Sequence, residues 1–407
     1  MIPLEERSSL PSASRQCEDA RIGALVIGGD YQGLGIVRSL GRRGIPVYVI
    51  DDAPSISRFS RYCTRHFSCP PLHEEETIVS ALIETAKALP HDRCVLYPTR
   101  EELVAAISKH RSELEPFYRV PTPEWNVVQW AWDKRNTYQL AAKLGIPAPV
   151  THYLTDSAQL GELESLAPPF VIKPAIKEHF IYATRAKAWR ADSFAELKVL
   201  FEKASALTGP GEVMIQELIP GDGQHQYACC AFFRENELAG KMVVRRRRQF
   251  PLQFGRSSTF VETLDLPILE EYAQRFLSAI GYYGLAELEF KYDSRTREYK
   301  LLDVNLRTWG YHSLGARAGV DFSYMLYADQ AGMPIEKCHS RPGLAWIRLS
   351  TDLPAAAIGA ARGEVKIGPY LRSLLTCRQE AAFSWDDPIP GFAEAAMIPY
   401  LAVKKGF

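Results

Sequence analysis

Short apolar runs alternate with amphipathic stretches over most of the chain, a pattern typical of α/β proteins. Near the start, an apolar run at 22–27 ends in Gly28 and Gly29, an amphipathic stretch follows at 36–43, and a second apolar run lies at 46–50. This succession of strand, glycine turn, helix and strand predicts the opening of a doubly wound parallel sheet. The same unit is predicted to continue with a helix at 76–88, a strand at 94–97 and a helix at 101–108.

The glycine turn departs from the dinucleotide-binding pattern. GxGxxG would need glycine at positions 28, 30 and 33, but Asp30 occupies the middle position, and its side chain would obstruct a pyrophosphate. A Walker loop is not matched either, because no Lys followed by Ser or Thr comes after the turn. We interpret the turn as structural or as a wall of a substrate site, and Asp30 disfavours a dinucleotide-dependent dehydrogenase.

After a predicted linker at 120–124, shorter elements follow. A helix begins near Asp133 and ends at Gly145, because the prolines after that glycine prevent its continuation. The segment 176–187 is predicted to be irregular, with basic side chains available to phosphates: Lys177, His179, Arg185 and Lys187. Strands are predicted at 150–154, 169–174, 213–219, 227–233 and 238–244, and helices at 158–166, 194–206 and 269–280.

Two strand ends in this part carry features of a nucleotide site. Lys173 lies inside an apolar strand end, where a cation has little exposed surface unless an anion meets it. The strand at 213–219 breaks at Pro220 and Gly221, so its last backbone groups cannot continue a ladder and are free to bind a flat heterocycle. Asp222, directly after this break, could accept hydrogen bonds from ribose hydroxyls.

Four consecutive arginines, Arg245 to Arg248, end the strand that begins at 238. Alternation along a strand predicts that Arg246 and Arg248 share one face. Such a run is most often a solvated or nucleic-acid-facing strip. Here it opens into the loop 249–258, whose sequence suits anion recognition.

The stretch 284–309 has the most regular alternation, with apolar and polar residues exchanging places on both sides of a polar turn. Side chains two residues apart share a face of a strand, so Glu287 and Glu289 point the same way. On the return strand one face carries Asp303, Asn305 and Arg307. The pattern predicts a hairpin with an acidic face.

A hairpin that pairs Asp293 with Tyr299 places acidic groups opposite each other. The predicted cross-strand pairs are Glu289 with Asp303 and Glu287 with Asn305. Like charges directly opposite destabilise a sheet unless a hard cation lies between them, and Mg2+ prefers this mixture of carboxylate, amide oxygen and water. A metal site is one hypothesis, and a solvated face neutralised by Arg307 and Lys291 is the other.

Composition adds few constraints. The chain has 407 residues, 46% hydrophobic and 24% charged, which is ordinary for a globular protein of two or three domains. Lys plus Arg equals Asp plus Glu at 48 each, so no net charge favours nucleic acid or a membrane surface. The eight scattered Cys predict a reduced cytoplasmic protein without structural zinc. The polar residues 1–20 predict a flexible arm and not a signal peptide, and no apolar run reaches the ~20 residues of a membrane helix.

Five segments resemble the ATP-grasp superfamily of carboxylate-amine ligases. They are DKRNTYQLAAKLGIPAP, VIKP, VMIQELIPGD, GLAELEF and LLDVNLR. Each is weak alone, but all five occur in the family's order, and the resemblance covers roughly residues 22 to 335. The segment RRRRQFPLQFGRSSTFVET is similar to a branch near D-aspartate ligase and other amino-acid ligases.

The resemblance implies an α/β chain with the ATP-grasp fold, a Rossmann-like pre-ATP-grasp domain and a small C-terminal extension. The implied divisions are a flexible arm at 1–20, the Rossmann-like domain at 21–120, the small ATP-grasp subdomain at 121–210, the large subdomain with the Mg/ATP site at 211–340, and a cap or extension at 341–407. No chemistry is assigned to this last part, including its acidic and proline-rich patch at 385–390.

Carried over residue by residue, the resemblance implies a nucleotide site. Lys134 and Lys173 are expected to bind ATP phosphates, and the ribose contact is assigned to Asp222, with Gln224 as the alternative. The backbone that reads adenine is expected at Gln216, Glu217, Leu218 and Ile219. The implied ligands of Mg2+ (two ions, with Mn2+ as an alternative) are Glu289, Asp303 and Asn305. The family often has Glu at the position of Asp303, and the shorter side chain keeps the charge while changing the geometry.

Three arginines are the implied catalytic residues. Arg307 is expected to clamp a phosphoryl or carboxylate oxygen, and Arg246 and Arg248 to offset developing charge. Glu287 stands where D-alanine-D-alanine ligase has Arg, which suggests an amine or guanidinium on the acceptor.

The implied reaction transfers the γ-phosphoryl group of ATP to a carboxylate, and an amine then attacks the acyl phosphate to give an amide, with release of ADP and phosphate. The expected partners are a small carboxylate and a small amine, with no nucleic acid and no membrane, and a homodimer is left open. One alternative is a carboxylase-type enzyme that activates bicarbonate. The other is a non-catalytic nucleotide-binding regulator, which has little need of paired carboxylates.

Overall fold

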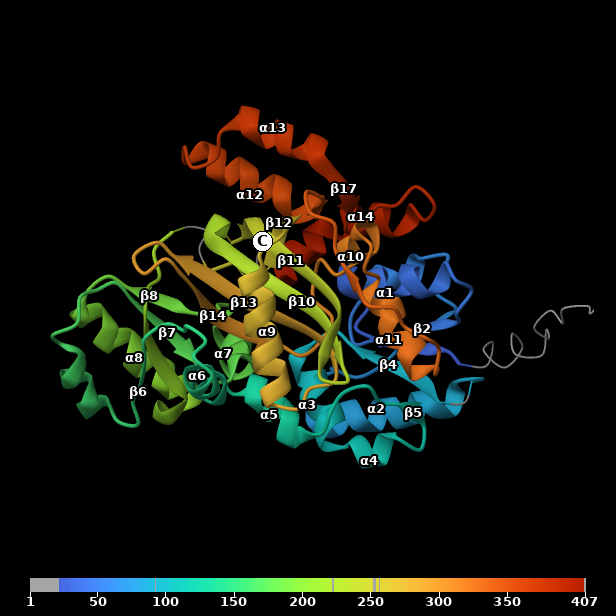
Figure 1. Ribbon diagram of the computed structural model, residues 1–407, viewed down its shortest axis with the longest axis horizontal. Coiled ribbons are helices and arrows are strands. Elements are labelled where there is room, and N and C mark those ends of the chain that lie inside the picture. The colour runs from blue at the N-terminus through green and yellow to red at the C-terminus, as the bar shows by residue number, and fades with distance from the viewer. Residues whose placement is uncertain (1–21, 92, 222, 252–253, 256, 406–407) are drawn as a thin grey trace, which may run out of the picture.

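The computed structural model describes residues 22–91, 93–221, 223–251, 254–255 and 257–405. Three β-sheets organise this part of the chain, and helices cover their faces, as expected for an α/β protein. Figure 1 shows the N-terminal sheet on one side, a four-stranded sheet on the other, and the largest sheet between them. Within the described residues, no helix is both long enough and apolar enough to cross a membrane.

The N-terminal sheet is parallel throughout, with the doubly wound strand order β3-β2-β1-β4-β5. Its strands are β1 (Ala24–Ile27), β2 (Val47–Asp51), β3 (Arg65–Ser68), β4 (Cys94–Pro98) and β5 (Tyr118–Arg119). Its helices are α1 (Tyr31–Gly41), α2 (Glu75–Ala88), α3 (Glu101–Lys109) and α4 (Arg111–Leu114), with a short 3-10 helix η2 (Ser57–Phe59). The doubly wound sheet predicted from the apolar runs is confirmed.

The glycine turn between β1 and α1 is built for close packing. Asp30 caps α1, because its carboxylate accepts a hydrogen bond from the backbone N–H of Gln32 at 2.9 Å. Gly28 has φ +97°, and a Cβ there would meet the Thr99 hydroxyl oxygen at 2.2 Å. The residue that breaks the dinucleotide pattern is therefore a helix cap, which agrees with the structural interpretation of the turn.

The four-stranded sheet is antiparallel, with the order β6-β9-β7-β8. Its strands are β6 (Thr151–Tyr153), β7 (Phe170–Pro174), β8 (Trp189–Ala191) and β9 (Val213–Glu217). Around it lie α7 (Lys177–Thr184), α8 (Phe194–Thr208) and the 3-10 helices η3 (Ser157–Leu163) and η4 (Pro210–Glu212). Helix α8 and part of α7 close a compact core over one face of this sheet.

The prediction of an irregular segment at 176–187 is wrong, because helix α7 forms there. Phe180 is buried on this helix and packs edge-on against Trp189 of β8, with ring centroids 4.6 Å apart. The helix ends at Arg185, whose left-handed φ of +57° stops further turns. The basic residues of this segment obscure its amphipathic pattern in the sequence, and the contact between Phe180 and Trp189 stabilises the helix.

The largest sheet has eight strands. Seven follow the order β14-β13-β10-β11-β12-β16-β17, and β15 pairs with β11. They are β10 (Gln226–Arg234), β11 (Glu237–Phe250), β12 (Ser257–Leu264), β13 (Gly284–Asp293), β14 (Glu298–Asn305), β15 (Cys338–His339), β16 (Ala345–Ile347) and β17 (Cys377–Glu380), with the 3-10 helix η5 (Gly223–His225) before β10. This sheet carries the acidic hairpin, as β13 and β14.

Both faces of the largest sheet are covered. Helices α5 (Trp125–Trp132), α6 (Lys134–Lys143) and α9 (Pro267–Ala279) pack on one face. Helices α10 (Ser313–Ala318) and α11 (Phe322–Gln330) cover the other face together with α1, so one apolar core runs from the N-terminal sheet into the largest sheet. The hairpin of β13 and β14 is therefore held in part by a core that the N-terminal sheet and the largest sheet share.

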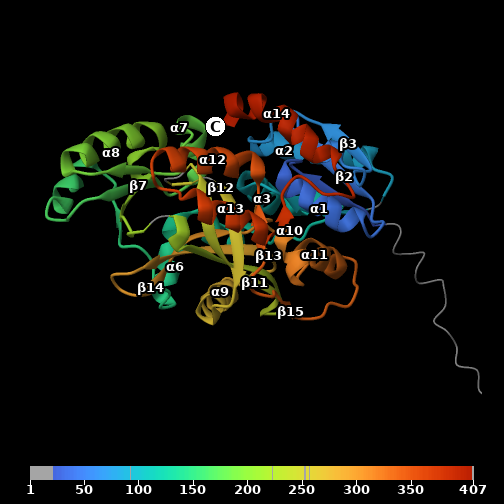
Figure 2. The ribbon, with the colours of Figure 1, turned by 90° about the horizontal axis from the view of Figure 1, so that it is seen from above.

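The C-terminal part adds two strands, β16 and the edge strand β17, and three helices. These are α12 (Leu349–Ala361), α13 (Ile367–Thr376) and α14 (Ile389–Lys405). Figure 1 shows α12 and α13 above β12, and the view in Figure 2 places α14 beside the N-terminal unit. The divisions at residues 120, 210 and 340 stay predictions; in the structure, β9 completes the four-stranded sheet and β16 and β17 extend the largest one.

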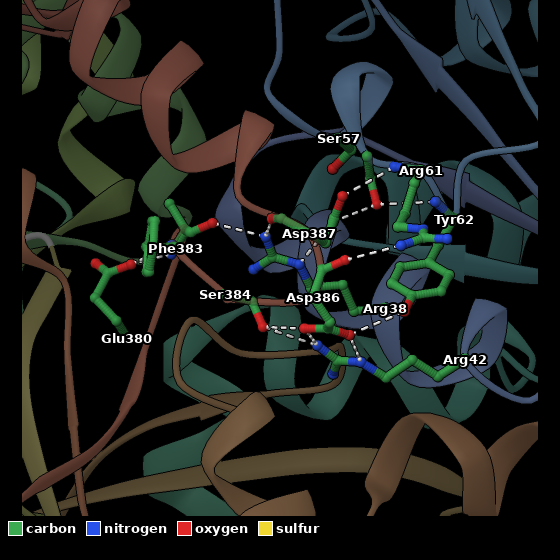
Figure 3. A network of polar contacts seen from close by, with 12 residues as sticks. Arg38, Arg42, Ser57, Arg61, Tyr62, Glu380, Phe383, Ser384, Asp386 and Asp387 are labelled. Atoms are coloured by element: carbon green, nitrogen blue, oxygen red, sulfur yellow. Dashed lines mark hydrogen bonds and ion pairs between the residues drawn. The ribbon is translucent and has the colours of Figure 1, made fainter.

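The loop 381–388, between β17 and α14, is fastened to α1 by a polar network that we call the C-terminal clamp (Figure 3). Arg38 donates from Nε to Asp387 at 2.9 Å, and the two side chains are only 4% and 1% exposed. Next to this pair, Arg42 and Asp386 form a more exposed ion pair at 2.8 Å. The acidic and proline-rich patch at 385–390 is thus explained as an anchor for the C-terminal part.

Candidate functional site

The hairpin of β13 and β14 has the predicted cross-strand pairs at its functional end. Glu289 lies opposite Asp303 and Glu287 opposite Asn305, as counting along the strands predicted. The predicted register at the turn is wrong by one residue, because Asp293 pairs with Glu298 and not with Tyr299. A bulge next to Phe290 leaves Leu302 unpaired and restores the predicted pairs.

Two carboxylates of this face, those of Asp303 and Glu289, have a protein cation beside them. Lys134 Nζ lies 2.6 Å from Asp303 Oδ1, and Arg246 Nη2 lies 3.5 Å from Glu289 Oε2. The face is not solvated, since the side chains of Asp303 and Glu289 are 13% and 15% exposed. The neutralising partners of the solvated-face hypothesis lie elsewhere: Lys291 donates to the carbonyl of Gly221, and Arg307 binds Glu101.

The set Glu289, Asp303 and Asn305 suits a magnesium ion. The described residues contain no group of three or more His, Cys, Asp or Glu side chains arranged around one point. The predicted set instead combines two carboxylates with one amide. Asn305 Nδ2 donates to Glu287 at 2.9 Å and to Glu289 at 3.3 Å, so the amide nitrogen and not Oδ1 faces these acids, and joint coordination by the three residues stays a prediction. The donor chemistry fits Mg2+.

Glu287 is buried at the inner end of this face. Tyr311 donates a short hydrogen bond to Oε1, and Asn305 donates to Oε2. Burial, followed by the neighbouring charge of Glu289, raises the pKa of the Glu287 carboxyl to about 7. Both of its oxygens accept hydrogen bonds from protein donors, so we interpret Glu287 as a residue that stabilises the hairpin.

A cleft of about 820 Å³ opens above the hairpin, between the largest sheet and the four-stranded sheet. It brings together most of the predicted site residues. Its lining includes Lys134, Lys173, Lys187, Gln216, Glu217, Leu218, Ile219, Arg246, Phe254, Gly255, Glu289 and Asp303. We call this space the nucleotide cleft.

Of the lysines that line the nucleotide cleft, three differ in their partners. Lys134 is paired with Asp303, while Lys173 donates to the Tyr138 hydroxyl at 2.8 Å and to the Leu302 carbonyl at 3.0 Å. Lys187 makes no hydrogen bond or ion pair with any described residue. Burial lowers the pKa of the Lys187 ammonium. A partly buried cation in this state is suited to an anionic ligand.

The hinge 216–219 lines the nucleotide cleft, and its polar side chains are hydrogen-bonded to the protein. Glu217 accepts from Lys300 at 2.6 Å, from Arg295 at 2.6 Å and from the backbone N–H of Val150 at 3.1 Å. Gln216 donates to the Thr151 hydroxyl at 2.8 Å. The backbone N–H groups of Glu217 and Leu218 donate to the carbonyls of Val150 and Pro169 at 3.1 and 3.4 Å, so the reading of adenine by this backbone stays a prediction.

The candidate ribose contacts are less well defined. Asp222 lies outside the described residues. Gln224 lies in η5, where its backbone carbonyl accepts a hydrogen bond from Arg245 Nε at 2.8 Å. The assignment of a ribose contact stays a prediction.

The arginine run divides between two places. Arg246 is 8% exposed and reaches the nucleotide cleft. Arg248 does not reach it, because register shifts around Arg248 break the alternation and turn its side chain toward the C-terminal part. There it binds Asp352 of α12 through two nitrogens, each at 2.8 Å, and donates to Ser373 of α13 at 2.9 Å. The prediction that Arg246 and Arg248 share a face is therefore wrong.

Arg307 is held at the edge of the hairpin by a residue that the sequence analysis did not single out. Its Nε donates to Glu101 Oε1 at 2.7 Å, and Lys177 Nζ lies 2.7 Å from the same oxygen. The available signal was position: Glu101 follows β4 at the carboxyl edge of a parallel sheet, where ligand sites of doubly wound sheets lie.

A second cavity, of about 1680 Å³, lies at the carboxyl ends of β1, β2 and β4. Its wall includes the glycine turn, together with residues of α7 and α14. Arg348 pairs with Glu394 at 2.6 Å and stacks over the Tyr31 ring at 4.0 Å. Burial raises the pKa of Tyr31 to about 12, so its hydroxyl stays protonated at neutral pH. We call this space the N-terminal cavity.

Comparisons with known proteins agree with this architecture. No known family profile matches the chain. Among curated proteins it resembles D-aspartate ligase of Enterococcus faecium, with 23% identity over 251 residues. The match covers 58% of this chain and 59% of that protein, so the chain spans about three fifths of the length of the curated relative it matches.

Solved structures resemble the chain over most of its length. The L-amino acid ligase of Bacillus licheniformis has a TM-score of 0.60 at 16% identity, over 80% of this chain and 78% of the ligase. The biotin carboxylase domain of the Hydrogenobacter thermophilus 2-oxoglutarate carboxylase, in complex with MgADP, ADP and bicarbonate, has a TM-score of 0.63 at 15% identity, over 80% and 73%. N5-carboxyaminoimidazole synthase of Aspergillus clavatus, with ADP and 5-aminoimidazole ribonucleotide, has 0.59 at 18%, over 79% and 80%.

These likenesses define the class: the chain has the ATP-grasp fold, as its five motifs predicted. Within that class, its sequence is similar to a D-amino-acid ligase.

Proposed function

We propose that the protein is an ATP-dependent ligase that joins a carboxylate to an amine through an acyl phosphate and releases ADP and phosphate. One observation carries the proposal. The hairpin places Glu289, Asp303 and Asn305 on one buried face, beside the lysines of the nucleotide cleft and in line with the hinge. A protein that only binds a nucleotide has little need of two carboxylates held opposite each other in low exposure.

The residues of the cleft divide the work of binding. The hinge backbone meets the adenine, and Lys134, Lys173 and Lys187 meet the phosphates. Glu289, Asp303 and Asn305 would hold Mg2+, which would supply positive charge to the phosphate oxygens. Lys134 and Arg246 already lie beside these carboxylates, so the metal ligands are balanced in charge before the ligand arrives, and the remaining lysines of the cleft are left to meet the phosphates.

The charge of Arg307 acts both on Tyr31, in the wall of the N-terminal cavity, and on Glu289, in the nucleotide cleft, so we assign to it the oxygens of the group that is transferred. A carboxylate oxygen of the acid attacks the γ-phosphorus, the bond to the bridging oxygen breaks, and ADP leaves with the electron pair. The amine nitrogen then attacks the acyl carbon, phosphate leaves, and the nitrogen loses a proton to solvent. We place the acid and the amine in the N-terminal cavity, next to Tyr31 and Arg348.

The test is Mg2+-dependent release of ADP and phosphate from the purified protein against a matrix of amino acids and small carboxylates. The resemblance to D-aspartate ligase and to an L-amino acid ligase makes amino acids the first compounds to include. Release that needs one acid and one amine together, and that is lost in Asp303→Ala, supports the proposal. ATP binding without release for any pair favours a nucleotide-binding regulator, and absence of ATP binding contradicts the assignment.

A carboxylase-type enzyme is the second candidate. It is favoured by the structural likeness to a biotin carboxylase domain whose complex contains bicarbonate. The same assay distinguishes the two, because an enzyme that activates bicarbonate releases ADP with bicarbonate in the absence of any amino acid. Omission of bicarbonate by degassing, with the amino acids present, is the reciprocal control.

A further inference from the structure

Glu101 joins three parts of the fold at one carboxylate oxygen. It is the first residue of α3, directly after the carboxyl end of β4. Its Oε1 accepts from Arg307 Nε at 2.7 Å and lies 2.7 Å from Lys177 Nζ at the start of α7. All three side chains are largely buried, with exposures of 13% for Glu101 and 16% for each cation.

The contact fixes the orientation of the Arg307 guanidinium. Nε is held by Glu101, and Nη1 donates to the carbonyl of Thr308 at 2.9 Å. Among the described residues, none accepts a hydrogen bond from Nη2. Two anchored nitrogens therefore leave the third pointing free for a ligand oxygen, in the planar geometry that suits phosphoryl and carboxylate groups.

Glu101 is the carboxylate closest to both cations. At hydrogen-bond distance it serves Arg307 and Lys177 together, while the other acid near Lys177, Glu178, is buried and lies 3.8 Å from Nζ. Burial alone would raise the pKa of the Glu101 carboxyl, but Arg307 and Lys177 lower it below its ordinary value, so the group stays ionised. The charge that holds the two cations in place is therefore present at neutral pH.

The next residue holds α7 in a different way. Glu102 accepts a hydrogen bond from the Tyr182 hydroxyl at 2.8 Å, one and a half turns along α7 from Lys177. Glu102 has no contact with Arg307. The two neighbouring glutamates thus both fasten α7 to the N-terminal unit, and only Glu101 also orients Arg307.

We propose that Glu101 is a positioning residue that holds Arg307 and Lys177 jointly against the transferred phosphoryl group. This inference rests on the ATP-dependent reaction proposed above. Its physical basis is that a guanidinium and an ammonium fixed in advance by a shared carboxylate need not reorganise when the phosphoryl charge develops. Neither cation alone is oriented by another acid at hydrogen-bond distance among the described residues.

The experiment compares Glu101→Gln with the matched control Glu102→Gln. Binding of ADP and of the non-hydrolysable analogue AMP-PNP is measured by calorimetry with Mg2+. The dissociation constant of ADP divided by that of AMP-PNP then reports the contact with the γ-phosphoryl group. We expect this ratio to fall by about 10-fold in Glu101→Gln and to stay within about 2-fold of wild type in Glu102→Gln. Hydrogen exchange in α7 should rise in both variants, because each loses one tie to that helix.

Turnover gives the second measurement once an acid and amine pair is known. We expect kcat to fall by about 10- to 100-fold in Glu101→Gln, with KM for ATP rising in step with the dissociation constant of AMP-PNP, and Glu101→Asp, which keeps the charge, to recover part of the loss. A merely structural role would change Glu101→Gln and Glu102→Gln alike.

Three outcomes overturn the inference: equal ratios of dissociation constants in the two Gln variants, no recovery in Glu101→Asp, or an unchanged kcat in Glu101→Gln. The two proposals fail separately. If wild type turns over no substrate pair but the ratio falls only in Glu101→Gln, the positioning role stands and the ligase reaction does not. If wild type binds neither nucleotide, both are overturned.

Discussion

Two buried charge networks, the C-terminal clamp and the nucleotide cleft, use the same residue types in opposite ways. In the clamp, Asp387 is surrounded by protein donors: Arg38 Nε at 2.9 Å, the Ser60 hydroxyl at 2.6 Å and the backbone N–H of Arg61 at 2.9 Å. Arg38 in turn donates from Nη2 to the carbonyls of Ala382 and Asp387. Figure 3 shows this closed set of contacts.

The nucleotide cleft leaves hydrogen-bonding capacity unused. Lys187 has no partner among the described residues, one oxygen of Glu101 serves two cations, and Arg307 keeps one nitrogen without an acceptor there. Burial and charge are therefore common to both networks. A binding site differs from a structural anchor because it has hydrogen-bond donors and acceptors that the protein itself does not satisfy.

The largest expected effect belongs to the cleft. Asp303→Asn removes the charge that faces Glu289, and we expect kcat to fall by about 10³-fold, because the cation that bridges the phosphates loses a carboxylate ligand. The gain in ATP affinity on adding Mg2+ should also disappear, as measured by calorimetry with and without the ion. Asp192→Asn, at an exposed ion pair, is the control. Retention of the Mg2+ effect would remove Asp303 from the metal set.

The clamp should show the reverse profile. Asp387→Asn leaves Arg38 buried without its counter-charge, which costs about 3–5 kcal/mol of unfolding free energy by urea titration. ATP affinity should stay within about 2-fold, since the clamp lies outside the cleft. Asp386→Asn is the matched control: its ion pair with Arg42 is 42% and 39% exposed and is worth under about 1 kcal/mol. Equal losses in the two variants would mean that burial does not decide the strength of these pairs.

The same contrast explains what the sequence could predict. The face of the hairpin was predictable because side-chain alternation is a local property of strands, and the pairs of Glu289 with Asp303 and of Glu287 with Asn305 followed from counting. The bulge at Leu302 was not predictable, and the pairs came out correctly only because it offset a one-residue error at the turn. In β11 a comparable irregularity had no such offset and sent Arg248 to α12.

Contacts between distant segments were beyond the sequence pattern. Asp387 reads as part of a polar patch until Arg38, 349 residues earlier, is seen beside it. Glu101 and Arg307 are separated by 206 residues; the first begins α3 and the second follows the end of β14. Periodicity assigns a residue to a face of its own element, but the partner on another element is fixed only by the packed cores that bring the elements together.

An effect of intermediate size is expected at Lys187, where a single side chain tests the comparison of the clamp with the cleft. Lys187→Met removes a cation that makes no hydrogen bond or ion pair with a described residue, so kcat should fall by about 100-fold while the melting temperature stays level or rises slightly. The rise follows from relief of the burial that lowers the pKa of this ammonium. Lys143→Met, at an exposed position on α6, is the control and should change neither quantity. A marked loss of stability in Lys187→Met would show that this lysine belongs with the structural networks.

The smallest expected effect comes from a partly exposed cluster of ion pairs that belongs to neither the C-terminal clamp nor the nucleotide cleft. His110 lies 2.7 Å from Glu113 and 2.9 Å from Glu75, and Glu113 is the first of the neighbours that raise its pKa. Because the raised pKa belongs to the folded state, its stabilisation is fully present below pH 6.5, the ordinary value, and is lost as pH rises through the folded value. We expect His110→Gln to lower the melting temperature by about 1–2 °C at pH 5.5 and by nothing measurable at pH 9, since exposed pairs contribute under about 1 kcal/mol. A deficit that persists at pH 9 would assign the effect to packing, and the cluster would then resemble the C-terminal clamp.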